Sequence, residues 1–357
     1  MFGLLDKNTA ILLLSNLAVL ASLFGIGRYL KKRSSVDIDA ETVRSFSRNM
    51  MAWMVVCVVL ALALMVDTVV ITVIFFWFVS FWAQREFVTL TPTKPSDHRT
   101  LFFLILVFPI AQYILVGMGA YDLYSIVIPV YGTLFIGARI AFANDPDEFL
   151  ERTAKLQFGL LICVYALSHA PALLTLDMLM TWDSSDGQWV QWMGAKAGLL
   201  LYLVVIVQIS DMTHFIADRT VGRHVIAPKV NEFKSWEGLM TAIVVSAIVG
   251  LLIQMFLPVT PFQLHGAAVM AIIISVMASS GSMTMCAIKK DRGIARHGGL
   301  VQSRGVLDRI ASLCFAAPIY FHVTRFFLQV GGIEDIEKAN EGLEAVFQIS
   351  WQTGFWN

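Results

Sequence analysis

Charged residues are scarce in this sequence. Asp, Glu, Lys and Arg make up 15% of the 357 residues, whereas the hydrophobic residues make up 57%. Soluble globular domains carry about 25% charged residues, so the composition excludes a soluble protein of this length. Cysteines are also few. The four present show no spacing typical of a zinc site or a disulfide framework, and we find no P-loop, dinucleotide fingerprint or internal repeat.

Apolar runs long enough to cross a bilayer recur along the whole chain. They predict an all-α, polytopic integral membrane protein with about ten transmembrane helices. The predicted spans lie near residues 10–29, 50–66, 69–83, 101–117, 121–139, 156–176, 192–210, 239–256, 264–283 and 310–328. The third run is short enough to fuse with the second into a hairpin, so the predicted number of transmembrane helices holds to within one. The first run has only Lys7 before it and no small-x-small site after it, which argues against a cleavable signal.

Lys and Arg gather in alternate loops, although the formal net charge is zero. In a ten-span topology this asymmetry predicts that the basic loops are cytoplasmic and that both termini lie outside. The loop at 178–191 on the opposite side has no basic residue. A basic cytoplasmic surface suits anionic lipid headgroups or nucleotide phosphates, but control of topology alone explains most of these charges.

A first polar segment, DMTHFIADRTVGRHVIAPKVNEFKSWEG, runs from Asp211 to Gly238. Its predicted substrate-binding residues are Arg223, Lys229, Lys234, Ser235 and Glu237. Three cations on a short loop, followed by a hydroxyl and the amides of a helix N-terminus, are suited to phosphate. The glutamate either caps that helix or takes part in catalysis. Asp211 ends an apolar run, where an acid is energetically costly unless it is paired, hydrated or metal-bound. A solvated helix end is the simpler alternative.

A second polar segment, GSMTMCAIKKDRGIARHGGLVQSRGVLDRIASLCFAAP, begins at Gly281. Together the two segments resemble the signature motifs of phosphatidate cytidylyltransferases (CDP-diacylglycerol synthases), and the resemblance covers roughly residues 50–328. Gly281, Lys289, Lys290, Asp308, Arg309 and Ser312 keep the pattern of the second motif. Ser282, Arg296 and Ala311 stand where the family pattern has acids.

The resemblance implies transfer of CMP from CTP to phosphatidate, giving CDP-diacylglycerol and pyrophosphate, with Mg²⁺ as cofactor. It implies catalytic roles for Asp308, Arg309 and Lys289, substrate binding by Lys290 with the first segment, and metal binding by Asp308 and Asp211. Magnesium needs hard oxygen ligands, so the three replaced acids predict a metal site that is weakened or absent. The resemblance also implies that the protein lies in a bacterial inner membrane.

Two functions therefore stay open from the sequence. One is an enzyme of phospholipid biosynthesis with a rebuilt metal site. The other is an inactive relative that binds anionic lipid or a partner protein. The expected partners are phosphatidate or another anionic lipid, CTP and the membrane, with a second copy or a paralogue as a further candidate and no nucleic acid.

The chain divides into three predicted parts. Residues 1–49 hold the first span and a basic loop, residues 50–328 form the cytidylyltransferase-like membrane domain, and residues 329–357 form an extracytoplasmic tail. The tail alternates apolar and acidic residues, which predicts an amphipathic helix on the outer surface or a subunit contact.

Overall fold

The computed structural model describes residues 5–32, 40–66, 68–177, 179–183, 188–293 and 305–328. The predicted tail at 329–357 lies outside the described residues. The long helices of the first half are α1 (Lys7–Lys32), α2 (Ala40–Met65) and α3 (Val69–Leu90). The long helices of the second half are α10 (Ala197–Thr220), α11 (Trp236–Phe256), α12 (Leu264–Asp291) and α13 (Val306–Leu328).

Three further crossings are helices interrupted by a π-helical turn. They pair α4 (His98–Phe102) with α5 (Phe108–Gly117), α6 (Tyr121–Ile126) with α7 (Thr133–Ala141), and α8 (Phe149–Leu160) with α9 (Leu167–Ala172). Short 3₁₀ turns at Pro95–Asp97 and Leu173–Thr175 flank the first and last of these pairs. Two antiparallel hairpins are the described strands: β1 (Met180–Asp183) with β2 (Gln188–Gln191), and β3 (Val225–Ala227) with β4 (Asn231–Ser235).

The helices confirm the predicted polytopic all-α membrane protein. Among the described residues, nine helical segments are long and apolar enough to cross a membrane, and the apolar stretch Met50–Met65 of α2 adds a shorter one. The expectation of a short third span was wrong, because α3 is a separate helix of 22 residues. The seventh span was placed too early: β2 and a loop precede α10, which begins at Ala197.

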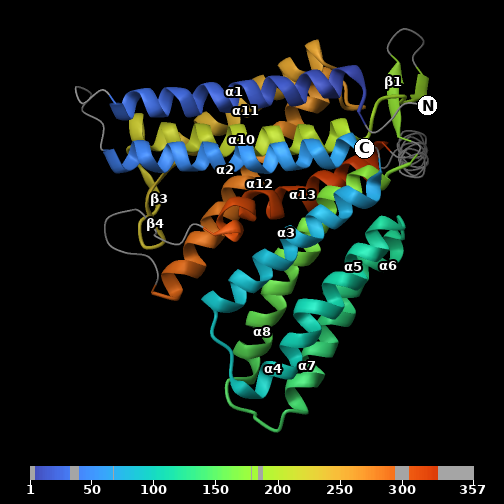
Figure 1. Ribbon diagram of the computed structural model, residues 1–357, viewed down its shortest axis with the longest axis vertical. Helices are drawn as coiled ribbons and strands as arrows, with labels where there is room; N and C mark the ends of the chain where they lie inside the picture. The colour runs from blue at the N-terminus through green and yellow to red at the C-terminus, as the bar shows by residue number, and fades with distance from the viewer. Residues whose placement is uncertain are drawn as a thin grey trace, which may run out of the picture.

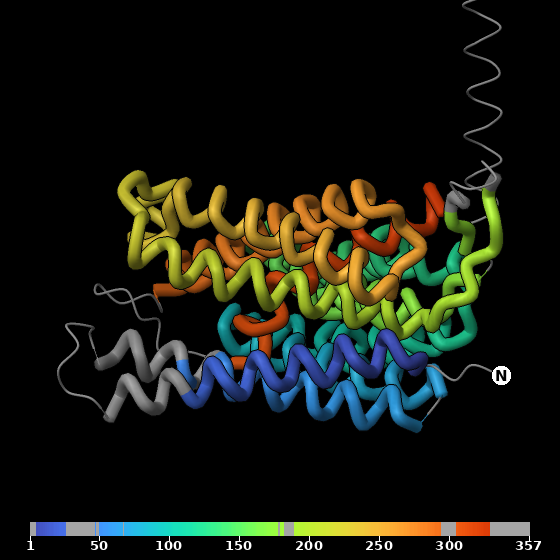
Figure 2. Tube along the Cα trace, turned by 90° about the horizontal axis from the view of Figure 1, so that it is seen from above, coloured from blue at the N-terminus to red at the C-terminus, as the bar shows by residue number. Residues whose placement is uncertain are grey.

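Successive crossings run in opposite directions (Figure 1). The start of α1, the β1–β2 hairpin and the end of α13 lie on one side of the bundle, and the β3–β4 hairpin lies on the other. We call the side that carries the β3–β4 hairpin the hairpin face. In Figure 2 the α1–α2 pair forms a layer of its own beside the remaining helices.

Helix α10 is the centre of the bundle. Its side chains from Ala197 to Gln208 are all buried, as expected for a membrane helix that is surrounded by other helices. By contrast, α11 buries only a stripe of small residues: Gly238, Ala242, Ser246 and Gly250. Small side chains at this spacing let helices approach closely. At Gly250 a methyl group would come within 2.5 Å of the Tyr202 hydroxyl of α10. The close packing of α10 and α11 brings their polar ends together at the hairpin face.

Candidate functional site

One face of α10 carries three polar side chains toward the hairpin face. Asp211, His214 and Asp218 are spaced by three and four residues, so they lie on the same side of the helix. The Ser312 hydroxyl of α13 donates to Asp211 Oδ1 at 2.8 Å. His214 Nδ1 lies 3.2 Å from Ser279 Oγ of α12. These contacts link α10 to both helices of the second motif segment.

Asp218 fixes the β3–β4 hairpin on α10. Its Oδ1 accepts hydrogen bonds from the backbone N–H of Ser235 at 2.9 Å and from the Ser235 hydroxyl at 2.8 Å. The same hydroxyl accepts from the Gly238 N–H at 3.0 Å and so caps α11. Gly238 has to be glycine here, because a methyl group would sit 2.0 Å from Asp218 Oδ1. Ser235, predicted to offer a donor to phosphate, instead bonds within the protein.

Glu237 also holds the loop before the hairpin. Its Oε2 accepts from the backbone N–H groups of Arg223 and His224, each at 3.1 Å, and its Oε1 lies 2.5 Å from the His224 ring. The expected roles of this glutamate were helix capping or catalysis, whereas its contacts are those of a loop-positioning residue and Ser235 is the residue that caps α11. Arg223 and Lys229 are exposed, and no side-chain hydrogen bond or ion pair ties them to another described residue.

Lys234 of β4 lies near the polar face of α10. It is half-buried and interacts electrostatically with Asp211, His214 and Asp218. Beside it, the Asn231 amide donates to Cys286 Sγ of α12 at 3.2 Å. The hairpin is thus attached to α12 as well as to α10. It places the cationic side chain of Lys234 near Asp211 and Asp218 of α10.

The second motif segment supplies an ion pair between α12 and α13. Lys289 is 2% exposed, and its ammonium group is bonded to the carboxylate of Asp308 in the first turn of α13. Asp308 and Ser312 are four residues apart and share a face of α13, so the pair lies about one helical turn from the Ser312–Asp211 contact. Arg309 is half-buried in the same turn, whereas Lys290 is exposed.

Two of the three positions where the family pattern has acids lie among the described residues. Ser282 is half-buried on α12, and Ala311 is buried on α13, where its carbonyl oxygen lies against Gly281. Arg296 lies outside the described residues.

The residues expected to hold Mg²⁺ do not assemble a magnesium site in the described part of the chain. Asp308 is paired with Lys289, and Asp211 accepts from Ser312. The described residues include no group of three or more Asp, Glu, His or Cys side chains placed to share a metal ion. Magnesium favours near-octahedral oxygen coordination, and this donor set does not fit it.

Two acids of the site were missed from the sequence, and one of them comes from a distant helix. Glu86 of α3 accepts from the Leu307 N–H at the start of α13, at 3.1 Å, and its other oxygen is buried. Glu86 lies three residues after the end of the third apolar run, a position like that of Asp211, which follows the seventh run. Asp218 is the other, since it lies beyond the predicted end of its span. The site thus draws on six elements: α3, α10, β4, α11, α12 and α13.

Comparison with known proteins shows the family to which the chain belongs. Residues 46–327 match the Cytidylyltransferase family. Uncharacterized protein YnbB of Escherichia coli (strain K12) is 33% identical over 258 residues, which are 71% of this chain and 79% of YnbB. Phosphatidate cytidylyltransferase of Pseudomonas aeruginosa is 29% identical over 192 residues (54% of this chain, 65% of the relative), and that of Haemophilus influenzae is 28% identical over 134 residues (36% and 46%). The chain therefore spans less than two thirds of each of these two enzymes.

Proposed function

The chain belongs to the cytidylyltransferase family, and from this premise we propose that it is a phosphatidate cytidylyltransferase-like enzyme of phospholipid biosynthesis. In this proposal it binds CTP and phosphatidate, or a closely related lipid phosphate, at the hairpin face. The products are CDP-diacylglycerol and pyrophosphate.

One observation carries the proposal: the two motif segments meet on the polar face of α10. Ser312 of the second segment contacts Asp211 of the first, and Ser279, two residues before the second segment on α12, contacts His214. Lys234 of β4 lies near this region, and Lys289 of α12 is bonded to Asp308, which is one helical turn from Ser312 on α13. Two cations at the end of a membrane bundle are suited to a phosphate that remains attached to a lipid.

The proposed reaction is a displacement at phosphorus. An oxygen of the lipid phosphate attacks the α-phosphorus of CTP, a new P–O bond forms, and the bond from the α-phosphorus to the bridging oxygen breaks as pyrophosphate leaves. Negative charge spreads over the transferring group and the leaving group, and fixed cations stabilise it. Lys234 and Lys289 supply that charge, and Asp308 holds the Lys289 ammonium in place. No step is assigned to a metal ion, because the donor set described above does not fit one.

The proposal includes an orientation. The hairpin face is cytoplasmic, in agreement with the basic residues of its loops and with the cytoplasmic supply of CTP. The end of α13 and the start of α1 then lie on the outer side.

A second function is favoured by the Lys289–Asp308 pair. The acid that the family pattern would use for metal is bonded to a lysine, and the positions of two further expected acids hold Ser282 and Ala311. An inactive relative that binds anionic lipid or a partner protein would retain these cations without needing carboxylate ligands.

Turnover separates the two functions. Purified protein in phosphatidylcholine vesicles is given CTP labelled in its α-phosphate and phosphatidate, with Mg²⁺ or with EDTA, and labelled lipid is measured. Labelled CDP-diacylglycerol supports the enzyme. No product at saturating substrates, with the P. aeruginosa enzyme active alongside, rejects the enzyme; phosphatidate binding then decides whether the second function holds.

A further inference from the structure

Glu86 of α3 caps a helix that lies 221 residues further along the chain. Its Oε2 accepts a hydrogen bond from the backbone N–H of Leu307 at 3.1 Å. Leu307 belongs to the first turn of α13, and the N–H groups of a first turn have no carbonyl partner within their own helix. A carboxylate also stabilises the positive end of the helix dipole. The contact therefore ties the start of α13 to α3, which lies outside both motif segments.

The chain passes directly over the Glu86 carboxylate just before α13 begins. A methyl group at Gly305 would overlap that carboxylate. Gly305 is not among the glycines with positive φ, so glycine is needed here for the close approach and not for an unusual backbone conformation. Glu86 Oε1 is also buried. The carboxylate is thus enclosed by the segment whose position it fixes.

The end of α3 gives this carboxylate a fixed base. The neighbouring Phe87 is 4% exposed, and a methyl group on Gly159 of α8 would come within 2.6 Å of its ring. The Thr91 hydroxyl donates to the Phe87 carbonyl oxygen at 2.8 Å. Closely packed helices transmit a displacement instead of absorbing it. The position of Glu86 is therefore set by the packing of α3 against α8.

The turn that Glu86 caps is the turn that carries Asp308. Asp308 directly follows Leu307 and is bonded to Lys289, whose side chain is 2% exposed. We propose that Glu86 is a positioning residue for this ion pair. By fixing the start of α13, it fixes the Asp308 carboxylate and, through it, the Lys289 ammonium group. The inference deepens the proposed function and rests on it where turnover is measured.

A double-mutant cycle tests this role through binding of CTP and of phosphatidate to the full-length protein in phosphatidylcholine nanodiscs. Glu86→Ala should weaken binding about tenfold, the effect of one lost hydrogen bond to a charged group. In the Lys289→Gln background the same substitution should add little, because Glu86 acts through that lysine. Glu86→Gln keeps an acceptor oxygen and should restore most of the binding. If the wild type turns CTP over, kcat should fall about 100-fold in Glu86→Ala, as expected for a misplacement of about 1 Å.

Gly305→Ala disturbs the same contact without removing the carboxylate, and it covers the case in which Glu86→Ala folds poorly. The overlap falls on the far end of a flexible side chain, so Glu86 turns away while the backbone keeps its place. Melting should stay near that of the wild type, but binding should weaken as in Glu86→Ala. The variant with both substitutions should bind like Glu86→Ala alone, because the overlap is then gone.

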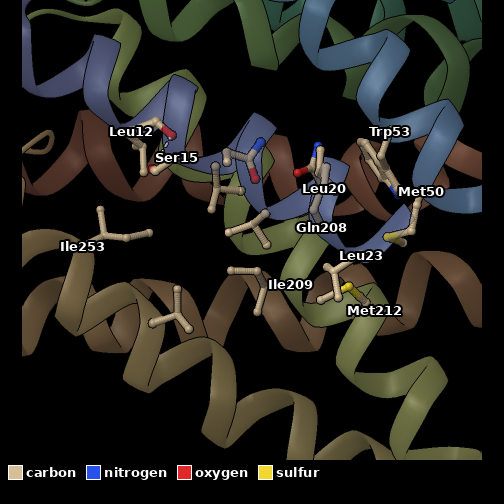
Figure 3. Close-up of a pocket in the computed structure, with 14 residues that line it drawn as sticks. Leu12, Ser15, Leu20, Leu23, Met50, Trp53, Gln208, Ile209, Met212 and Ile253 are labelled. Carbon is tan, nitrogen blue, oxygen red and sulfur yellow. Dashed lines mark hydrogen bonds between the residues drawn. The ribbon is translucent and has the colours of Figure 1, made fainter. Parts of the chain in front are cut away.

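Asp6→Ala is the matched control. Asp6 Oδ1 accepts from the Thr9 N–H at 2.8 Å and so caps α1, whose start lies on the side opposite the hairpin face (Figure 1). Helix α1 meets α10 across an apolar groove lined by residues such as Leu20 and Ile209 (Figure 3). Losing this cap should lower the melting temperature and leave binding unchanged.

Two results would overturn the proposal. One is unchanged binding in Glu86→Ala. The other is an equal loss on that substitution in the wild-type and Lys289→Gln backgrounds, since Glu86 would then serve stability alone. Absence of turnover in the wild type would reject the enzyme but not this inference, which the binding cycle decides.

Discussion

Gly281 sets how closely the two helices of the second motif segment can approach, and Gly281→Ala should drive them apart. A methyl group at this position of α12 would sit 2.4 Å from the Ala311 carbonyl oxygen of α13 and 3.0 Å from the Phe315 ring. Ordinary contact begins near 3.4 Å, so the shortfall against the backbone oxygen is about 1 Å (3.4 minus 2.4). A backbone atom cannot turn aside as a side chain can, so the helices themselves must move.

The expected effect has two parts. Overpacking of this kind costs about 1–3 kcal/mol, which should lower the apparent melting temperature. Lys289 and Asp308 sit on the two helices that separate, and a misplacement of about 1 Å in a catalytic site costs about 100-fold in rate. If the protein has the proposed activity, CDP-diacylglycerol formation should fall by about that factor. Thermal unfolding in detergent and the labelled-CTP assay measure the two effects.

Gly266→Ala is the matched control on the same helix. Its methyl group would meet Phe262 Cβ at 3.5 Å, an ordinary contact, so melting and activity should stay near those of the wild type. The reasoning is refuted if Gly281→Ala melts and reacts like the wild type, because α12 and α13 would then tolerate a methyl group that the packing excludes.

Three further predictions concern stability, catalysis and topology. Arg152→Met leaves the fully buried Asp97 without its ion-pair partner, now 2.5 Å away, and should destabilise the protein by about 3–5 kcal/mol; wild-type melting would contradict this. Asp308→Ala removes the acid that positions the buried lysine of α12 and should abolish turnover, whereas unchanged turnover would remove this acid from the mechanism. Cysteines introduced at Ser35 and Ser184 should react with a membrane-impermeant maleimide from opposite sides, and reaction from the same side would contradict the proposed topology.

The order of the helices was predictable because an apolar run of sufficient length has few alternatives to a membrane helix. The ends were not. Hydropathy reports only the part of a helix in the apolar region, so α3 and α10 were predicted to end before their polar turns. The helix of Asp218 continues to Thr220, and that polar turn holds the hairpin. The β3–β4 hairpin itself was not predicted, because the sequence between Arg223 and Ser235 was read only as a loop that carries cations.

Of the candidate site, the sequence indicated the two segments and most of their charged residues. The roles within it depend on packing between distant elements. Glu86 and Leu307 are 221 residues apart, and no spacing rule brings α3 to the start of α13. Ser235 and Glu237 had the chemistry expected for phosphate binding and for helix capping. Only the position of α10 shows that the Ser235 hydroxyl donates a hydrogen bond to Asp218. The sequence thus indicated chemical types, while the helix packing decided their partners.

The central claim is that Lys234 and Lys289, which lie in different motif segments, serve a single anionic site. Binding of phosphatidate and of CTP tests it in Lys234→Gln, Lys289→Gln and the double variant, at low and high salt, with melting curves to confirm folding. The account predicts weaker binding in each single variant, a larger loss in the double variant that departs from the sum of the two, and a stronger effect at low salt. Unchanged binding of both ligands by a folded double variant would contradict it.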